Sequence, residues 1–213
     1  MLMRMFDLQD KIVLAVEKSL ETILSPNESN RPYPAENIAD ISLDKDRLKK
    51  SRSLMRVNHA GEIAAQALYN GQAVFARSEE TIAHLEKSAE EEKDHLAWCA
   101  KRIAELEGEK SLLDPFWYLG SFTLGLIVGL TSDQFSLGFI AETEEQVGKH
   151  IKDHINKIPK NDLKSQAILK QMAEDEAEHG SHAKNMGGVK MPHLLTKLMS
   201  IGGEILRKVA YRI

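Results

Sequence analysis

The sequence contains a single cysteine, Cys99, among its 213 residues. One cysteine cannot form an intramolecular disulfide or a cysteine-based zinc or iron–sulfur site, and this scarcity favours a reducing compartment. Aromatic residues make up only 6% of the chain, and the apolar–polar alternation that is typical of strands is scarce. The thirteen glycines and six prolines are too few for a collagen-like or low-complexity chain. These absences leave an all-α globular protein as the predicted fold class.

An excess of positive charge is also missing. The chain carries 28 lysines and arginines against 32 aspartates and glutamates, which gives a net charge of −4. Such a chain has no global positive field to attract nucleic acid, so we expect no nucleic-acid partner. The start of the chain lacks the apolar segment of a secretory signal and the arginine-rich, acid-poor composition of a transit peptide. We therefore expect the protein to face the cytosol.

Apolar residues recur at three- and four-residue spacings, which predicts amphipathic helices. The predicted helical segments are 6–24, beginning at Phe6, and then 44–78, 80–107, 135–158, 161–187 and 191–213. Asn161 or Asp162 is expected to cap the helix over 161–187. Prolines interrupt the pattern between 25 and 40, which predicts a linker there. The sequence thus predicts an N-terminal helix and Pro-rich linker over 1–40, followed by a helical domain over 41–213.

A glutamate lies in the middle of the apolar face of each of the four long central helices. These residues are Glu62, Glu92, Glu144 and Glu176. An ionised carboxylate buried alone is very costly, so such groups must pair, become protonated or bind a cation. The neighbouring acids point 100–200° away around an ideal helix and are expected to be exposed to solvent; they include Glu91, Glu145 and Glu178.

Two of these glutamates have a histidine three residues later, in Glu92-x-x-His95 and Glu176-x-x-His179. Residues three apart are neighbours on a helix surface, so a carboxylate and an imidazole can converge on one point. Two helices with a Glu and two with a Glu-x-x-His pair are the pattern of di-metal helical bundles. The mixed oxygen and nitrogen set suits iron or manganese. The alternative is that these stretches are ordinary acidic helix faces in solvent.

Other histidines and the cysteine receive simpler interpretations. His59, three residues before Glu62, is a candidate for a contact that supports the ligands. The remaining histidines have no predicted partner, and surface or core positions are expected for them; they are His84, His150, His154, His182 and His193. Cys99 is expected to be a small core residue.

Two segments suggest contact with a membrane. Residues 115–132 are free of charge but contain three glycines and a proline, which argues against a membrane span. A span would also separate Glu92 from Glu144, so we expect this segment to dip into one leaflet, with Trp117 and Tyr118 at the interface. A buried core connector is the alternative. The last helix has an apolar side flanked by Lys197, Arg207, Lys208 and Arg212, which suits an anionic surface or a core or dimer contact.

Four segments of the sequence resemble one known family. They are Arg-Val-Asn-His-Ala-Gly-Glu at 56–62, Glu-Glu-Lys-Asp-His-Leu at 91–96, Glu-Thr-Glu-Glu at 142–145 and Asp-Glu-Ala-Glu-His at 175–179. Together they resemble the demethoxyubiquinone hydroxylases of ubiquinone biosynthesis, over about residues 45–213. That family consists of ferritin-like di-iron monooxygenases, bound peripherally to the membrane, that use O2 to hydroxylate the ring of a polyprenylated methoxy-methyl-benzoquinol.

The resemblance implies a fold, a cofactor and a set of site residues. It implies a ferritin-like four-helix bundle. The helical patterns add an apolar connector between core helices two and three, an N-terminal helix outside the resemblance and a C-terminal amphipathic helix. The resemblance also implies two iron ions per chain, with Glu92 and Glu176 as bridges. The implied metal ligands are Glu62, Glu92, His95, Glu144, Glu176 and His179. The candidate substrate-channel residues are Phe116, Trp117, Phe122, Leu126 and Phe139.

The resemblance further implies partners and a location. The substrates would be a polyprenyl benzoquinol and O2. The reductant would be external, because the chain has no Gly-x-Gly-x-x-Gly fingerprint after a strand. The expected location is the cytoplasmic side of a bacterial inner membrane, as a peripheral protein, because a mitochondrial presequence is missing. A homo-oligomer, or association with other ubiquinone-biosynthesis proteins, is also expected.

Two alternatives stay open at this point. The first is another ferritin-like di-metal protein, such as a ferroxidase or a peroxidase, which would not need an apolar membrane segment. The second is a metal-free helical scaffold on a membrane, which would bind no iron. Metal content distinguishes the scaffold from the enzymes.

Overall fold

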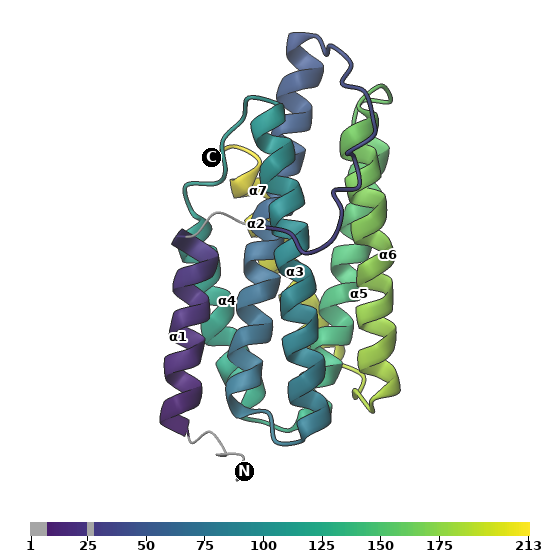
Figure 1. Ribbon diagram of the computed structural model, residues 1–213. Helices are drawn as coiled ribbons and strands as arrows, with labels where there is room; N and C mark the ends of the chain where they lie inside the picture. The colour runs from purple at the N-terminus through teal and green to yellow at the C-terminus, as the bar shows by residue number, and fades with distance from the viewer. Residues whose placement is uncertain (1–7, 25–27) are drawn as a thin grey trace.

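The computed structural model describes residues 8–24 and 28–213, and these contain seven helices and no strand (Figure 1). The helices are α1 (Leu8–Leu24), α2 (Lys45–Phe75), α3 (Glu79–Glu105), α4 (Asp114–Gly129), α5 (Asp133–Lys157), α6 (Leu163–Asn185) and α7 (His193–Ala210). The all-α prediction is therefore confirmed for the described residues. Phe6 and residues 25–27, part of the predicted N-terminal helix and linker, lie outside the described residues.

The ends of the helices follow from short polar side chains in the sequence. Asp44, Ser78, Ser132 and Asp162 each accept a hydrogen bond from the backbone N–H three residues later, at the start of α2, α3, α5 and α6. Such caps satisfy backbone donors that have no partner inside the helix. Asp162, and not Asn161, is thus the cap of α6. Beyond the end of α6, Gly187 adopts a φ of 94°, a conformation that glycine tolerates best.

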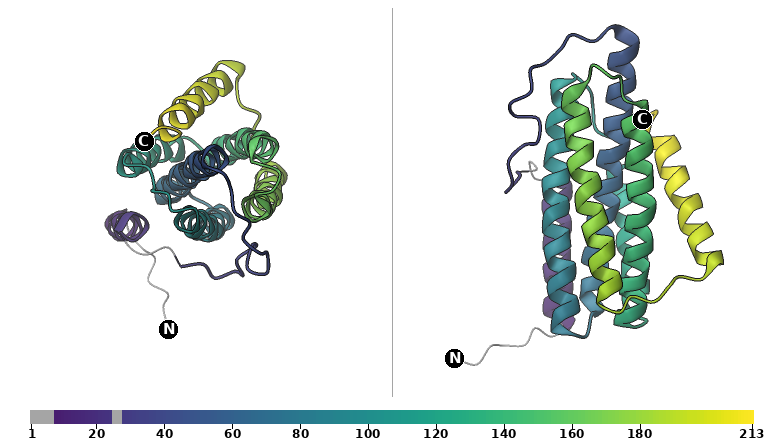
Figure 2. Two further views of the ribbon diagram at one scale, coloured as in Figure 1. Left: turned by 90° about the horizontal axis from the view of Figure 1, so that it is seen from above. Right: turned by 90° about the vertical axis from the view of Figure 1, so that its right-hand side faces the viewer.

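Helices α2, α3, α5 and α6 form a four-helix bundle, seen end-on in Figure 2. This arrangement confirms the predicted ferritin-like bundle. The two largest apolar clusters of the core lie at different levels along the bundle. One is built around Met55, Cys99, Ile151 and Leu169, and the other around Tyr69, Leu85, Ile140 and Ala183. The four mid-helix glutamates fall between these two levels in the sequence of each helix.

The charge-free segment after α3 forms the helix α4, which packs against α2 outside the bundle (Figure 2). Glycines allow this close packing. A β-carbon at Gly71 or Gly125 would overlap a backbone carbonyl of the facing helix, and one at Gly129 would lie 2.9 Å from the Gln72 carbonyl oxygen. The outer side of α4 exposes Phe116, Leu119 and Ile127. The segment is therefore packed on one side and apolar on its exposed side. The predicted interfacial position of Tyr118 is wrong, because this residue is buried against α2 and α3, whereas the contact of α4 with a membrane leaflet stays a prediction.

Two further parts of the chain cover the bundle. Helix α7 lies across α2 and α5, where Leu195 and Met199 pack against Leu68 and Phe139. The segment before α2 runs along α3 and α6 (Figure 1) and buries Ala35 in the apolar cluster around Met55. The division of the chain at residue 40 stays a prediction. None of the described helices is both long and apolar enough to cross a membrane.

The α2–α4 contact gives a test of the fold. We expect Gly125→Ala to lower the free energy of unfolding by about 1–3 kcal/mol, because its β-carbon overlaps the Leu68 carbonyl. Gly120→Ala is the matched control on the same helix, since a β-carbon there meets no atom within 4 Å. It should raise the free energy of unfolding by about 0.5–1 kcal/mol. Urea denaturation measures both values. Equal stabilities for the two variants would contradict the backbone-to-backbone packing of α2 and α4.

Candidate metal centre

The six predicted ligands come together in the middle of the bundle. Helix α2 supplies Glu62, α5 supplies Glu144, and the remaining four come as the pairs Glu92/His95 on α3 and Glu176/His179 on α6. None of the six is more than 5% exposed. The periodicity of the four helices explains this convergence, because each glutamate continues the stripe that its helix buries.

The donor atoms divide into two overlapping groups. The first group contains Glu62, Glu92, His95 and Glu176, and the second contains Glu92, Glu144, Glu176 and His179. Within each group one donor atom per residue lies within 4.8 Å of all the others. Glu92 and Glu176 belong to both groups. This arrangement fits two neighbouring cations that share two bridging carboxylates, as in carboxylate-rich helical bundles.

Both imidazoles present the same nitrogen to the carboxylates. His95 Nδ1 lies 3.1 Å from Glu92 Oε2 and 3.5 Å from Glu176 Oε1. His179 Nδ1 lies 3.4 Å from Glu92 Oε1 and 3.7 Å from Glu176 Oε2. Nδ1 is thus the nitrogen available to a metal on each ring.

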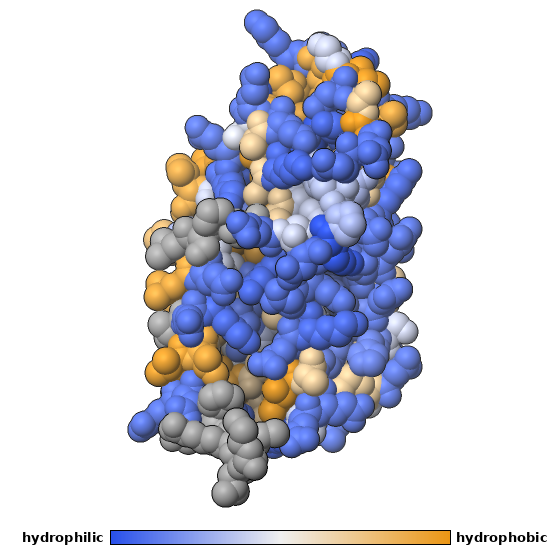
Figure 3. All heavy atoms as spheres, in the orientation of Figure 1, coloured by the Kyte–Doolittle hydropathy of each residue, from blue (hydrophilic) through white to orange (hydrophobic). Residues whose placement is uncertain are grey.

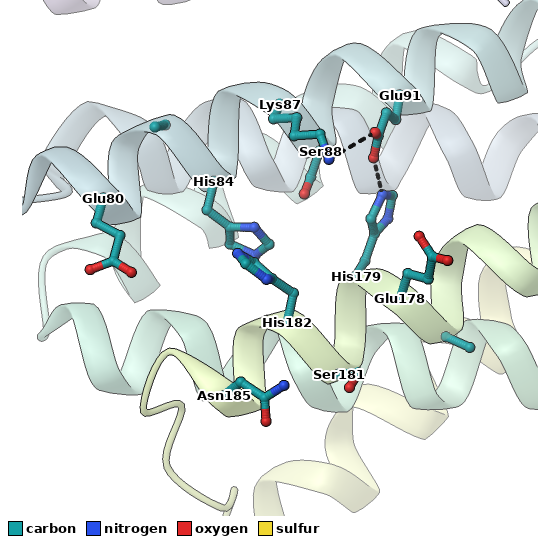
Figure 4. A pocket seen from close by; sticks show the side chains of 12 residues that line it. Glu80, His84, Lys87, Ser88, Glu91, Glu178, His179, Ser181, His182 and Asn185 are labelled. Atoms are coloured by element: carbon teal, nitrogen blue, oxygen red, sulfur yellow. Dashed lines mark hydrogen bonds and ion pairs between the residues drawn. The ribbon is translucent and has the colours of Figure 1, made fainter.

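The outer nitrogens of the two imidazoles are held in a reciprocal way. His95 Nε2, from α3, lies 2.8 Å from Asp175 on α6, and His179 Nε2, from α6, lies 2.5 Å from Glu91 on α3 (Figure 4). Asp175 directly precedes the ligand Glu176 on α6, and Glu91 directly precedes the ligand Glu92 on α3. Each of these two carboxylates therefore contacts the ligand histidine of the opposite helix. A carboxylate on the far nitrogen fixes the tautomer and orientation of a metal-bound imidazole. The prediction that Glu91 is exposed to solvent is therefore wrong, because this contact covers part of it, while Glu145 and Glu178 are exposed as predicted.

Arg31, in the segment before α2, holds Asp175 in place. Its Nη2 donates to Asp175 Oδ2 at 2.7 Å, and its Nε donates to Asp94 Oδ2 at 2.8 Å. The guanidinium also lies over the Trp98 ring, 4.7 Å from its centroid. The bonds from His95 and Arg31 overcome the effect of burial and lower the pKa of Asp175 below its usual range. The N-terminal segment is thereby tied to the ligand His95 through one carboxylate.

Tyr69 makes a contact with the candidate ligands that the sequence analysis did not identify. Its hydroxyl donates a hydrogen bond to Glu144 Oε1 at 2.5 Å, and its ring meets His179 edge-on. Burial and the adjacent Glu144 raise the pKa of Tyr69 well above its usual value, so the hydroxyl keeps its proton. The signal available in the sequence was a polar aromatic residue on the glutamate face of α2, seven residues after Glu62.

Neither His59 nor Cys99 forms a hydrogen bond or an ion pair with a candidate ligand. His59 Nδ1 instead lies 3.2 Å from Asp114 at the start of α4, and burial lowers the pKa of His59. Cys99 is fully buried, with its sulfur 3.8 Å from that of Met172, which confirms its predicted place in the core.

The surroundings of the candidate ligands shift their pKa values in different directions. Burial and the neighbouring carboxylates raise the pKa of Glu62 and Glu144 well above the usual value. Although burial opposes the charge on Glu92, the imidazoles of His95 and His179 lower its pKa. Although burial would favour neutral rings, the surrounding carboxylates raise the pKa of His95 well above normal and that of His179 to about 12. Protons thus take the place of cations in neutralising the carboxylates.

The residues present fit a pair of metal ions. Several buried ligand atoms have no hydrogen-bond partner; they are Glu62 Oε2, Glu92 Oε1, Glu144 Oε2, both oxygens of Glu176 and Nδ1 of His179. Buried polar atoms without a partner cost about 1–3 kcal/mol each, more when charged. These six atoms are the largest group among the fifteen buried side-chain atoms without a partner in the described residues. Two divalent cations would satisfy these atoms and match the charge of four carboxylates, and the donor set suits iron or manganese.

An apolar cavity of about 590 Å³ lies between α2, α4, α5 and α7, and Glu62 is part of its wall. Three of the five candidate channel residues line it, namely Phe116, Trp117 and Phe139. The other two lie elsewhere on α4: Phe122 packs in the cluster with Tyr118, and Leu126 lies against Gly71 of α2. Residues of α7 that complete the wall include Leu195, Leu198 and Leu206. The cavity joins the apolar face of the protein to one side of the candidate metal centre.

The contact between Arg31 and Asp175 can be tested through metal binding. We expect Arg31→Gln to weaken the binding of one of two Co²⁺ ions by about 10–100-fold, because Asp175 loses the group that positions it against His95. Arg47→Gln is the control, since Arg47 forms an exposed ion pair with Asp44 and should bind both ions as the parent does. Titration of metal-free protein, followed by visible absorbance, gives both affinities. Unchanged binding in Arg31→Gln would contradict the positioning role.

Comparisons with known proteins agree with this geometry. Residues 49–210 match the family model described as ubiquinone biosynthesis protein COQ7. The chain is 44% identical over 202 residues to the 3-demethoxyubiquinol 3-hydroxylase of Nitrosomonas eutropha, covering 95% of this chain and 97% of that protein. It is 42% identical over 204 residues to the enzyme of the same name from Azoarcus sp., covering 96% and 99%. The Xanthomonas euvesicatoria enzyme is also 42% identical over 204 residues, covering 96% and 94%. With all six candidate ligands inside the matched region, the chain belongs to the COQ7 family of ubiquinone biosynthesis proteins.

Proposed function

We propose that this chain is a 3-demethoxyubiquinol 3-hydroxylase, an O2-dependent di-iron monooxygenase of ubiquinone biosynthesis. The relatives that carry this name cover nearly the whole chain. The observation that carries the proposal is the apolar cavity whose inner wall contains Glu62, one of the six candidate ligands. A polyprenylated benzoquinol is an apolar substrate with a reactive ring, and it needs such a route to a metal centre.

The proposed metal centre is held by two overlapping sets of ligands. Glu62, Glu92, His95 and Glu176 would hold one iron ion, and Glu92, Glu144, Glu176 and His179 the other. Two iron ions bound there would supply the activation of O2. One oxygen atom of O2 becomes the new ring hydroxyl in place of a hydrogen, and the other leaves as water. The balance takes up two electrons and two protons, which we assign to an external reductant.

The residues of the chain orient and protect this chemistry. Asp175 and Glu91 fix the two imidazoles, so that both Nδ1 atoms face the carboxylates. The Tyr69 hydroxyl keeps its proton and holds Glu144 Oε1, which leaves Oε2 free. The apolar clusters on either side of the ligands exclude water from the centre. The cavity beside Glu62 positions the quinol ring, with Trp117 and Phe139 in its wall.

The size and polarity of the cavity favour hydroxylation over the related di-metal activities. A ferroxidase or a peroxidase acts on small polar molecules or ions, and it has no use for an apolar cavity of about 590 Å³. A metal-free scaffold would have no use for six buried polar ligands, five of which have atoms that lack hydrogen-bond partners. Manganese fits the same donors as iron, and we propose iron because the reaction needs O2 activation.

We also propose that the protein binds the cytoplasmic face of a bacterial inner membrane through α4 and α7. Both helices border the apolar cavity and expose apolar side chains next to it, including Leu119 and Ile127 on α4 and Ile201 and Ile205 on α7. Basic residues flank those on α7, as suits an interfacial helix on anionic lipid. A prenyl tail could then pass from the bilayer into the cavity while the ring reaches Glu62.

The remaining parts of the proposal concern the division of the chain and its assembly. We assign catalysis to residues 41–213 and a supporting role to residues 1–40, because Arg31 contacts Asp175. The exposed apolar side of α1, with Val13 and Leu20, offers a contact for a second copy or for another protein of ubiquinone biosynthesis. Figure 3 shows a face that is mostly hydrophilic, with apolar atoms gathered along the edge where α1 lies.

Substitution of single ligands tests the proposed function. Glu144→Ala and His179→Ala should each reduce ring hydroxylation by at least about a hundredfold and lower the bound iron, because each removes a candidate ligand. Helical content should be unchanged by circular dichroism. Glu145→Ala is the matched control, because Glu145 is the exposed neighbour of Glu144 and pairs with Lys149. Product formation from a demethoxyubiquinol and iron per chain are measured together. Wild-type hydroxylation by both ligand variants would sink the assignment.

Vesicle binding tests the proposed membrane face. Ile201 and Ile205 are 46% and 54% exposed, and neither lines the cavity. The double variant Ile201→Glu/Ile205→Glu should bind vesicles of phosphatidylethanolamine and phosphatidylglycerol at least about tenfold more weakly, because two apolar side chains no longer enter the bilayer. Leu163→Glu changes an exposed leucine at the start of α6 and should bind like the parent. Co-sedimentation gives the affinities. Equal binding by all three proteins would exclude α7 as the membrane contact.

A further inference from the structure

A second cavity, of about 690 Å³, lies between α3 and α6 (Figure 4). Its lining includes three carboxylates, from Glu80, Glu91 and Glu178, and one ammonium group, from Lys87. Lys87 and His179 both contact Glu91, at 3.3 and 2.5 Å, so the carboxylates of Glu80 and Glu178 are the remaining negative groups of the cavity. A concave surface of this charge concentrates cations from solution.

Two histidines approach each other across this cavity. His84 of α3 and His182 of α6 have ring centroids 4.8 Å apart, and Figure 4 shows the two side chains directed toward each other. His84 is only 7% exposed, and its Nε2 has no hydrogen-bond partner among the described residues. A buried ring nitrogen without a partner is costly unless a ligand satisfies it. His182 is exposed and can adjust its ring to a shared ion.

The charge state of His84 suits ligation. Burial and the neighbouring imidazoles of His182 and His179 lower the pKa of His84 to about 4. The ring is therefore neutral at pH 7 and keeps a lone pair for a metal ion. Imidazole ligands favour ions such as Fe²⁺, Co²⁺ and Ni²⁺ over Mg²⁺ and Ca²⁺, which take oxygen ligands.

The histidine pair lies in line with the candidate metal centre. On α6, His182, His179 and Glu176 follow at three-residue intervals, each about 4.5 Å further along the helix. On α3, His84, Ser88 and Glu91 line the same cavity. His179 and Glu91, which bond to each other, form the inner end of this cavity. Side chains that can bind an ion thus continue from the cavity to the centre at steps of one helical turn.

We propose that His84 and His182 bind a divalent cation and that ferrous ions enter the metal centre through this site. The entry role rests on the proposed di-iron centre, whereas the histidine site itself does not. An ion held by the pair exchanges water for the ligands of the next turn, with the rotation of His179 away from Glu91 opening the way. The transfer of the ion breaks no covalent bond of the protein and needs no change in the oxidation state of the ion.

Titration of metal-free protein with Co²⁺ tests this proposal, because its visible spectrum reports coordination without redox chemistry. We expect two tightly bound ions and a third, weaker one. His182→Gln and His84→Gln should lose the third ion and fill the two tight sites at least about tenfold more slowly at limiting Co²⁺, since one of two ligands is gone. Because His182 is exposed, its substitution should not disturb folding. His193→Gln, an exposed histidine on α7, is the control and should behave like the parent.

The outcomes separate this proposal from the di-iron centre. In Glu144→Ala, which removes a ligand of the centre, an ion that still binds and is lost on adding His182→Gln supports the histidine site. If the two tight sites of the parent protein stay empty while this ion binds, the proposed di-iron centre and the proposed entry role are both contradicted. The proposed histidine site is still supported by that result. A third ion retained in His182→Gln, or tight sites that fill at the parental rate, would overturn the proposal.

Discussion

The burial of four carboxylates in one apolar bundle is the constraint on which the rest of the structure depends. Glu62, Glu92, Glu144 and Glu176 lie between two apolar clusters, where water cannot neutralise them. Without cations, the raised pKa values of the two histidines and of two glutamates show that protons must do so. Even then, several carboxylate oxygens and one imidazole nitrogen have no hydrogen-bond partner among the described residues. The site therefore fits two positive ions. The burial of four carboxylates without such ions also lowers the folding stability of the protein.

The supports of the centre reflect a repeat within the sequence, in which a Glu is followed by a Glu-x-x-His pair, 30 residues later in the first half and 32 residues later in the second. Each Glu-x-x-His pair is preceded by an acid, and that acid contacts the histidine of the opposite repeat. The two repeats thus hold each other's imidazoles. They differ in what lies behind the acid: Asp175 is bound by Arg31, whereas Glu91 is bound by Lys87 beside the polar cavity. One imidazole is therefore fixed by a chain of charged contacts, and the other faces an opening.

The sequence predicted the bundle and its six candidate ligands because both depend on the period of a single helix. A glutamate on an apolar stripe has to face the core once the helix packs, whatever its partner. The contacts of Arg31, Asp175 and Glu91 depend instead on the rotation of α3 against α6 and on the path of the segment before α2. No pattern within one helix encodes these relations. The close contact of α4 with α2 was missed for a similar reason, since Gly71 and Gly125 matter only as a facing pair.

The two cavities lie on opposite sides of the bundle, and this separation has a chemical reason. The side of α2 and α5, covered by α4 and α7, is apolar and ends at Glu62. The side of α3 and α6 is lined by histidines and acids and ends at His179. A prenylated quinol cannot pass a surface of charged groups without losing the benefit of apolar burial, and a hydrated cation cannot cross an apolar cavity without losing its water. Under the proposed function, separate routes would let both reach the same buried centre, each through walls that match its own solvation.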